Sequence, residues 1–155
     1  VDRGFNSGWN KVQGLWTVTG ERNKEEPGSV SVEPSNLVSF NGNGKYSAPE
    51  LTCKISAGPT ALKFLSTEKL GNQYENDMLT TDVVTGRIYH FQLNHNRTGL
   101  LLSAPLTDKV ADSYDELDDV VFGGGFGLIS DLEIGPDGYL YVVALNDGKI
   151  YRVDS

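Results

Sequence analysis

Acidic side chains gather in residues 108–119, where six carboxylates lie close together in the chain. Carboxylate oxygens are ligands that calcium prefers, and calcium accepts flexible geometry. On a helix, Asp112, Asp115 and Asp118 would share one face, where like charges repel unless a cation lies between them. The spacing differs from that of an EF-hand loop. These three residues are therefore the candidate metal ligands, and a solvated acidic face is the alternative interpretation.

Other residue types that could do chemistry are histidine, glycine and the aromatics. No serine or cysteine is paired by pattern with His90 or His95, so a nucleophilic triad is not supported. The run GGGFG at 123–127 lacks the following helix and the Lys-Ser/Thr pair of a phosphate loop, and we expect it to approach a central channel instead. Some aromatics could stack on a sugar, with packing inside the fold as the alternative. They are Phe5, Trp9, Trp16 and Tyr46.

β-Strands must position these candidate residues. The sequence pattern of strands is clearest in residues 127–154. Three runs with β periodicity are separated by Gly-Pro-Asp-Gly at 135–138 and Asn-Asp-Gly at 146–148. The first run alternates apolar and polar residues. The second, YLYVVAL, is apolar nearly throughout, which predicts burial on both faces. The pattern predicts a meander of three antiparallel strands.

The chain repeats part of this unit. GRIYHF at 86–91 aligns without a gap on GKIYRV at 148–153, and the same offset of 62 residues places DMLTTDV on YLYVVAL. Such a period suits four-stranded propeller blades. We predict that four strands form the first blade and that a short helix or helical turn follows. The predicted strands are 61–65, 77–83, 87–93 and 101–106.

The predicted fold is all-β, with antiparallel four-stranded blades of a partial β-propeller of about two to three blades. We expect a single domain with an N-terminal arm (1–58), a blade (59–106), a connector (107–126) and the last blade (127–155). The last blade has three strands, which leaves KIYRVD as an exposed edge. Residues 14–19 are the candidate strand to close it. Because 155 residues hold about two and a half repeats, we expect the chain to need further blades or another copy of itself.

The composition of the chain disfavours several classes of binding partner. The net charge of −8 disfavours nucleic acid and anionic membranes, which bind through excess Lys and Arg. Cys53 is the only cysteine, so no intramolecular disulfide or cysteine metal cage forms, and we expect a small buried hydrophobe. No apolar run approaches the ~18 residues of a membrane span. The sequon Asn96-Arg97-Thr98 is consistent with export.

Several of these motifs, in order along the chain, resemble the soluble glucose/sorbosone dehydrogenase family. They are PTALKF (59–64), NDML (76–79) with GRIY (86–89), SDLEIGPDGYLY (130–141), and GFNSGW (4–9), which is similar to a glycine-tryptophan loop of the family. The resemblance covers residues 1–10 and 59–154, and its most specific part is the block Asp-x-x-x-Gly-Pro-Asp-Gly. It implies the C-terminal half of a six-bladed propeller that binds pyrroloquinoline quinone (PQQ) and calcium and oxidises sugars in an extracellular or periplasmic location.

The resemblance also implies positions for the quinone-binding cations. Family members place a lysine at the position of Val84, or of Thr85 if the register slips by one, and arginines at Leu128 and Ser130. The family's general-base histidine and main calcium loop belong to the N-terminal half, which this sequence lacks. A quinone with three carboxylates needs cations to offset its charge. We therefore expect no cofactor binding by this chain alone.

Three functions remain open on the sequence. The first is the C-terminal propeller portion of a PQQ-dependent, sugar-dehydrogenase-like oxidoreductase that is inactive by itself. The second is a non-enzymatic binding or scaffold module that closes a propeller by oligomerising. The third is a calcium-dependent hydrolase of the lactonase type.

Overall fold

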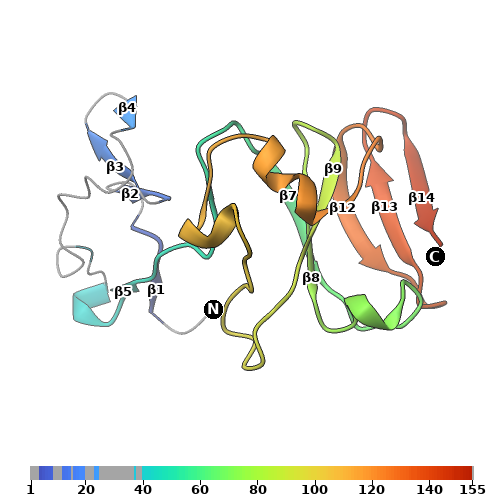
Figure 1. Ribbon diagram of the computed structural model, residues 1–155, viewed down its shortest axis with the longest axis horizontal. Helices are drawn as coiled ribbons and strands as arrows, with labels where there is room; N and C mark the ends of the chain where they lie inside the picture. The colour runs from blue at the N-terminus through green and yellow to red at the C-terminus, as the bar shows by residue number, and fades with distance from the viewer. Residues whose placement is uncertain are drawn as a thin grey trace. The chain divides into compact units, whose positions relative to one another are not determined.

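The computed structural model describes residues 4–8, 12–14, 16–19, 23–24, 37 and 40–154. The chain divides into two compact units, Val1–Thr52 and Cys53–Ser155. This boundary lies close to the predicted end of the N-terminal arm at residue 58. Short antiparallel sheets prevail and the described helices are 3-10 turns, which confirms the all-β prediction (Figure 1).

The first unit contains two small sheets. β1 (Phe5–Asn6) pairs in parallel with β5 (Lys45–Tyr46), just after the 3-10 turn η2 (Phe40–Gly42). The other sheet has the order β2-β3-β4, built from β2 (Val12–Gln13), β3 (Trp16–Thr19) and β4 (Asn23–Lys24). β3 falls within the predicted closing strand 14–19. Within its own unit, β3 pairs with β2 through Trp16 and Thr17 and with β4 through Val18 and Thr19, and its role in closing the last blade stays a prediction.

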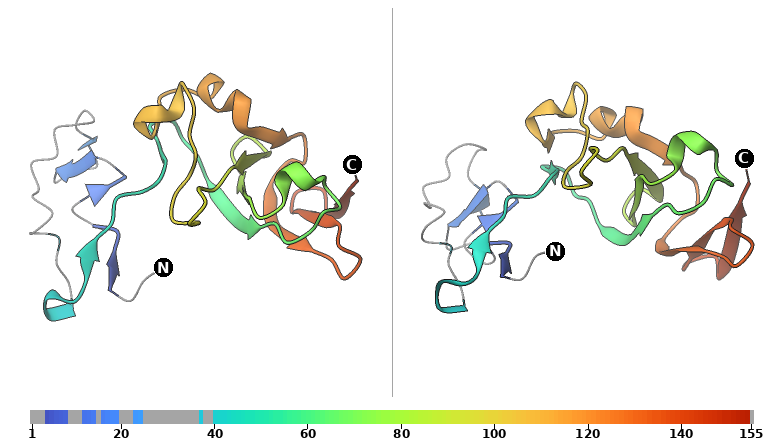
Figure 2. Two further views of the ribbon diagram at one scale, coloured as in Figure 1. Left: turned by 60° about the horizontal axis from the view of Figure 1, so that its bottom comes forward. Right: turned by 90° about the horizontal axis from the view of Figure 1, so that it is seen from below.

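The second unit contains two larger sheets, and Figure 2 shows them from two further sides. The first blade has the order β11-β9-β8-β7, and the second blade has the order β12-β13-β14. A shorter pair joins β10 (Val110–Ala111) to β6 (Thr52–Cys53), and Lys54 N donates to Ala111 O beside it. The blade strands are β7 (Pro59–Phe64), β8 (Met78–Asp82), β9 (Arg87–Phe91), β11 (Val121–Gly123), β12 (Ile129–Ile134), β13 (Leu140–Ala144) and β14 (Lys149–Val153).

The fourth strand of the first blade is β11, and not the predicted strand 101–106. β11 pairs with β9 through Val121 opposite Tyr89 and Gly123 opposite Ile88. Leu101 is exposed in irregular chain, and Leu106 begins the turn η4 (Leu106–Asp108). The connector continues through β10 (Val110–Ala111) to η5 (Asp115–Val120), the helical turn that the sequence predicted. The apolar run at 100–102 indicated a strand but pairs only once, as a single bridge from Leu100 to Leu93.

The offset of 62 residues is present in the strand register. Met78 lies opposite Phe91 in the β8–β9 hairpin, and Leu140 lies opposite Val153 in the β13–β14 hairpin. The first strands of the two blades are offset by more, because Lys63 and Glu133 are 70 positions apart and face Leu79 and Tyr141. The longer connection between β7 and β8, which includes η3 (Asn72–Tyr74), accounts for this difference. The predicted repeat is therefore structural.

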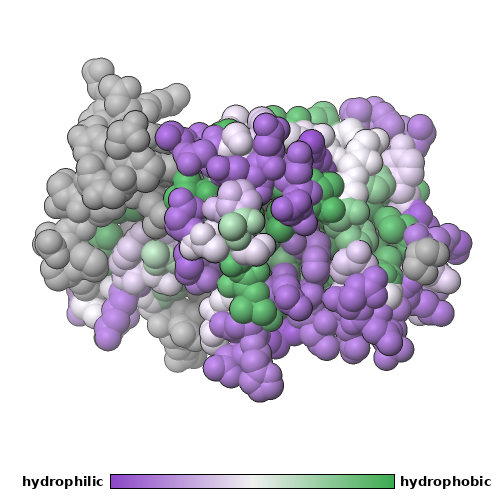
Figure 3. All heavy atoms as spheres, viewed as in Figure 1, coloured by the Kyte–Doolittle hydropathy of each residue, from purple (hydrophilic) through white to green (hydrophobic). Residues whose placement is uncertain are grey.

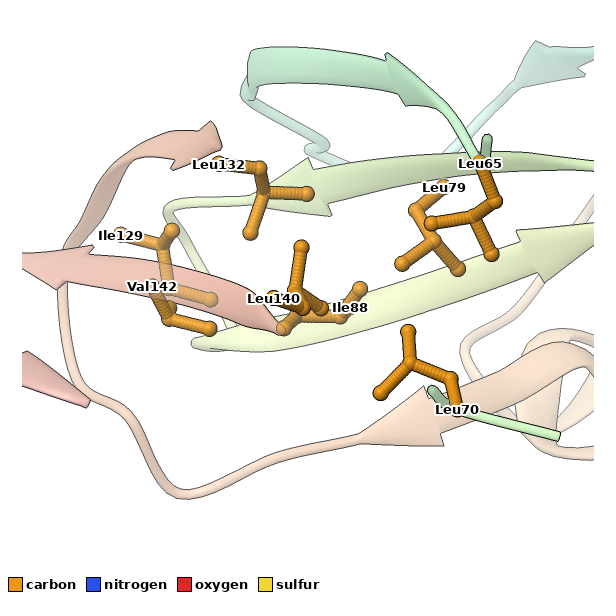
Figure 4. Packing of buried hydrophobic residues seen from close by; sticks show 8 residues of the cluster. All are labelled: Leu65, Leu70, Leu79, Ile88, Ile129, Leu132, Leu140 and Val142. Carbon is orange, nitrogen blue, oxygen red and sulfur yellow. The ribbon is translucent and has the colours of Figure 1, made fainter. Parts of the chain in front are cut away.

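Apolar side chains between the two blades form the core. Leu79 and Ile88 from the first blade belong to one cluster with Leu140 and Val142 from the second, and each of the four is fully buried (Figure 4). Leu65, Leu70, Ile129 and Leu132 complete the cluster. On β13 only one face is buried, since Tyr141 and Val143 are partly exposed. The prediction of burial on both faces of this strand is therefore wrong. No described helix is long and apolar enough to span a membrane.

Candidate functional site

Loops from both blades meet at one end of the sheets and form what we call the loop rim, residues 58–60, 82–87, 127–130 and 144–148. Thr60 Oγ1 donates to Ile129 O at 2.6 Å, which joins the starts of β7 and β12. Leu128 N donates to Asn146 Oδ1 at 2.9 Å. The turn after β8 is also in contact, because a Cβ on Gly86 would lie 2.6 Å from Gly127 O. The rim is therefore one continuous surface.

Asp82 organises the part of the rim that belongs to the first blade. This buried carboxylate accepts from Gly58 N at 2.8 Å, from Val84 N at 3.0 Å and from Thr85 Oγ1 at 2.7 Å. The three bonds fix the β8–β9 turn. Burial raises the pKa of the Cys53 thiol, and the charge of Asp82 raises it further. Asp82 is therefore a structural acceptor and not a free base.

The structure brings the three residues at the expected cation positions to this rim. Val84 lies exposed in the β8–β9 turn, and Leu128 lies exposed directly before β12. Ser130 is in β12, where its hydroxyl donates to Val143 O at 3.4 Å. Leu145 adds a third exposed apolar side chain. The rim thus presents apolar groups at two of the three positions where the resemblance implies cations, and a neutral hydroxyl at the third.

Basic side chains near the rim are already engaged. Arg87, in the rim, contacts Asp118 at 2.9 Å, and Lys149, directly after the rim, lies 3.7 Å from Asp147. Further along β7, Lys63 is paired with Glu133 across the two blades. The hydrogen bond and charge of Asp118 raise the pKa of Arg87. A tricarboxylate quinone would have to compete with these carboxylates, because an anionic ligand of this kind needs several available donors. The residues present therefore do not fit the quinone that the resemblance implies.

The three acidic residues predicted as metal ligands have different neighbours in the structure. Asp112 precedes η5 and contacts Lys54 Nζ at 3.2 Å, and Asp118 contacts Arg87. Asp115 begins η5, so only Asp115 and Asp118 share the helical turn. Among the described residues, no group of three or more histidine, cysteine or acidic side chains is arranged to hold a metal ion. Two of the three carboxylates already contact cations, and the calcium site stays a prediction.

His90 has a partner that the sequence analysis missed. Its Nε2 lies 2.9 Å from Asp77 Oδ2, and Asp77 Oδ1 accepts from Leu93 N at 3.1 Å. Tyr74 packs edge-on against the imidazole, with ring centroids 5.0 Å apart. The pair could have been found from the predicted hairpin, since His90 lies opposite Leu79, two positions after Asp77. No hydroxyl or thiol among the described residues bonds His90, so the pair has the orienting half of a triad and no nucleophile.

The remaining candidates lie elsewhere in the chain. His95 is exposed in the turn after β9. Within 123–127, Gly125 and Gly127 have positive φ, so the run bends between β11 and β12. Phe5 is exposed, and Tyr46 OH donates to Gly14 O at 3.4 Å. The other two predicted stacking groups, Trp9 and the side chain of Trp16, lie outside the described part.

Comparison of the sequence with models of known protein families matches no family, and comparison with curated proteins finds no matching relative. The fold and the contacts at the loop rim are therefore the basis for assigning a function.

Proposed function

We propose that the chain supplies two blades of a propeller related to the PQQ-dependent sugar dehydrogenases and does not oxidise sugars by itself. The proposal rests on the family resemblance of the blade motifs together with the loop rim. One observation carries the second half: Val84, Leu128 and Ser130 offer no positive charge at the positions where the resemblance implies one. The extracellular or periplasmic location that the resemblance implies belongs to the same proposal.

Binding of PQQ tests this function. The protein is titrated with PQQ in the presence and absence of calcium by isothermal calorimetry. We expect no saturable heat at micromolar concentrations and no quinone-dependent dye reduction with glucose. A stoichiometric complex with the unmodified chain would overturn the proposal.

A gain-of-function variant tests whether the rim corresponds to the family's cofactor surface. Val84→Lys, Leu128→Arg and Ser130→Arg together place three cations on the rim. Val84 and Leu128 are exposed, so the first two changes bury no charge. We expect the triple variant to bind PQQ measurably more tightly than the unmodified chain. A control adds the same charges at exposed positions outside the rim. Equal binding by both variants would mean that attraction of an anion by net charge explains the gain, which contradicts a specific site.

A second candidate function, a binding scaffold that closes by self-association, is favoured by the exposed faces of the outer strands. Ile150 on β14 and Leu62 on β7 are large apolar residues with more than half of their surface exposed. In Figure 3 hydrophobic residues also reach the surface among hydrophilic ones. These faces define which partner such a scaffold would take.

A further inference from the structure

The contact between the two blades provides an internal template for what should cover their free faces. We call the side of each blade that carries the equivalents of Leu79 and Ile88 its forward face, and the opposite side its rear face. In the first blade, the forward face packs on the rear face of the second, where Leu140 and Val142 lie. Residues directly opposite in an antiparallel pair share a face, so the strand register transfers these faces from one blade to the other.

The forward face of the second blade has no cover among the described residues. Ile150 is the equivalent of Ile88, since each follows its repeat glycine by two positions, and it lies opposite Val143. Ile88 is 0% exposed, whereas Ile150 is 68% exposed. Isoleucine is therefore buried at this position in the first blade and exposed at the equivalent position in the second blade. The rear face of a following blade covers Ile88, whereas no described residue covers Ile150 in this way.

The outer strand β7 is the open part of the rear face of the first blade. Leu62 and Leu132 are equivalent residues of β7 and β12, because they face Thr80 and Val142 in the register. Leu132 is 2% exposed, whereas Leu62 is 54% exposed. Phe64 lies on the same face, opposite Met78, and is also exposed. On the same face Tyr89 and Phe91 of β9, which lie opposite Thr80 and Met78, are buried, so the open part of the rear face is its outer strand β7. The chain thus carries an open forward face and an open β7 portion of a rear face.

Charge complementarity indicates which partner fits both faces. Within the chain, Lys63 of the first blade pairs with Glu133 of the second, and these two residues occupy equivalent positions. If another first blade followed the second, Glu133 would take the role of Lys63 and would meet the next Lys63. The pairing would therefore alternate in sign at each contact and never place like charges together. Lys63 and Glu133 already bond each other within each copy, so the contact extends this pair into a network of alternating sign, which a second copy of this chain supplies.

We infer that the forward face of the second blade docks the rear face of the first blade in a second copy of this chain, head to tail. The contact repeats the Leu79–Ile88 interface with Tyr141, Val143 and Ile150 on one side and Leu62 and Phe64 on the other. Such a heterologous contact adds copies until a ring closes. This inference deepens the scaffold candidate of the proposed function, and it uses the blade arrangement without depending on the relation to sugar dehydrogenases.

Sedimentation velocity over a range of concentrations tests this contact. The monomer has a mass of 16.9 kDa, and we expect larger species whose share rises with concentration. Ile150→Glu disrupts the forward face of the second blade in every copy, and Leu62→Glu disrupts the rear face of the first blade in every copy, so each variant alone should be monomeric. An equimolar mixture of the two retains one intact contact and should form a dimer that grows no further. Leu101→Glu, at a 55% exposed leucine that belongs to no blade strand, is the matched control and should associate as the unmodified chain does.

The outcomes separate the inference from its alternatives. A monomer at all concentrations, an Ile150→Glu variant that still associates, or a mixture that fails to dimerise would each overturn it. Association lost in Ile150→Glu but retained in Leu62→Glu would show a symmetric contact and would equally overturn it. Glu133→Lys should weaken association, and the double variant Lys63→Glu/Glu133→Lys should restore it. The thermal melt of each variant checks folding. Quinone titration reports independently on the proposed function.

Discussion

Removal of the Asp82 carboxylate should destabilise the second unit by about 2–4 kcal/mol. Asp82→Ala leaves Gly58 N and Val84 N without their acceptor and frees the Thr85 hydroxyl. Hydrogen bonds to a charged group contribute roughly 1.5–3 kcal/mol each. We expect less than the sum, because the turn is partly open and water replaces some of these bonds. The loss is nevertheless large for a domain that is stable by only about 5–15 kcal/mol.

Urea unfolding, followed by far-ultraviolet circular dichroism, measures this loss of stability. With a slope of about 1–1.5 kcal/mol per molar urea, the midpoint should fall by about 2 M. Asp82→Asn retains an acceptor for the two backbone amides, so we expect about half of the effect. Asn146→Ala removes one comparable bond at the other blade, to Leu128 N, and should cost about 1 kcal/mol. A free energy of unfolding for Asp82→Ala within about 0.5 kcal/mol of the unmodified chain would refute the role assigned to Asp82.

Three further perturbations test other parts of the second unit. Gly86→Ala should destabilise the fold by about 2 kcal/mol or more, because the positive φ of Gly86 and the carbonyl oxygen of Gly127, 2.6 Å from the added Cβ, both oppose a side chain. Gly148 is the repeat equivalent, and a Cβ there meets no atom within 4 Å, so Gly148→Ala should cost only about 1 kcal/mol in the same urea assay. Cys53 should react with iodoacetamide more slowly at pH 8 than a free cysteine, because its raised pKa lowers the thiolate fraction, and an equal rate would contradict the burial described. The hydrogen bond from Lys63 lowers the pKa of Glu133. The stability that this pair contributes should therefore be present above the ordinary pKa of 4.5 and be lost as the pH falls through the lower pKa of the folded state. If the stability of the unmodified chain did not change over this pH range relative to that of Glu133→Gln, this prediction would be contradicted.

Much of the second unit could be predicted from the sequence, because its strands are local and periodic. The hairpins of β8–β9 and β13–β14 follow from alternating residues around glycine turns, and Gly86 and Gly148 both adopt the positive φ that such turns require. The offset of 62 then placed equivalent strands in the same register. Local patterns were sufficient wherever neighbouring strands are also neighbours in the chain.

Partners that are distant in the chain could not be predicted in this way. β11 is three residues long and has little β pattern, yet it completes the first blade because the connector returns it to the edge of β9. The contacts of Asp112 with Lys54 and of Asp118 with Arg87 likewise depend on that return, so the acidic run indicated a metal site where the structure forms separate ion pairs. Positions 84, 128 and 130 were placed on one surface by the resemblance and not by any local pattern.

The open edge of β14 has a consequence for how the protein avoids aggregation. β14 ends the order of its sheet in the described part, so its outward amide and carbonyl groups can template another β-strand. Charged side chains along and beside it, Lys149, Arg152 and Asp154, discourage such pairing, and they are exposed. Salt screens charges of this kind within about 10 Å at 0.1 M. A concentrated salt solution should therefore promote fibrillar or amorphous association through β14, which makes ionic strength a determinant of how long the protein remains dispersed.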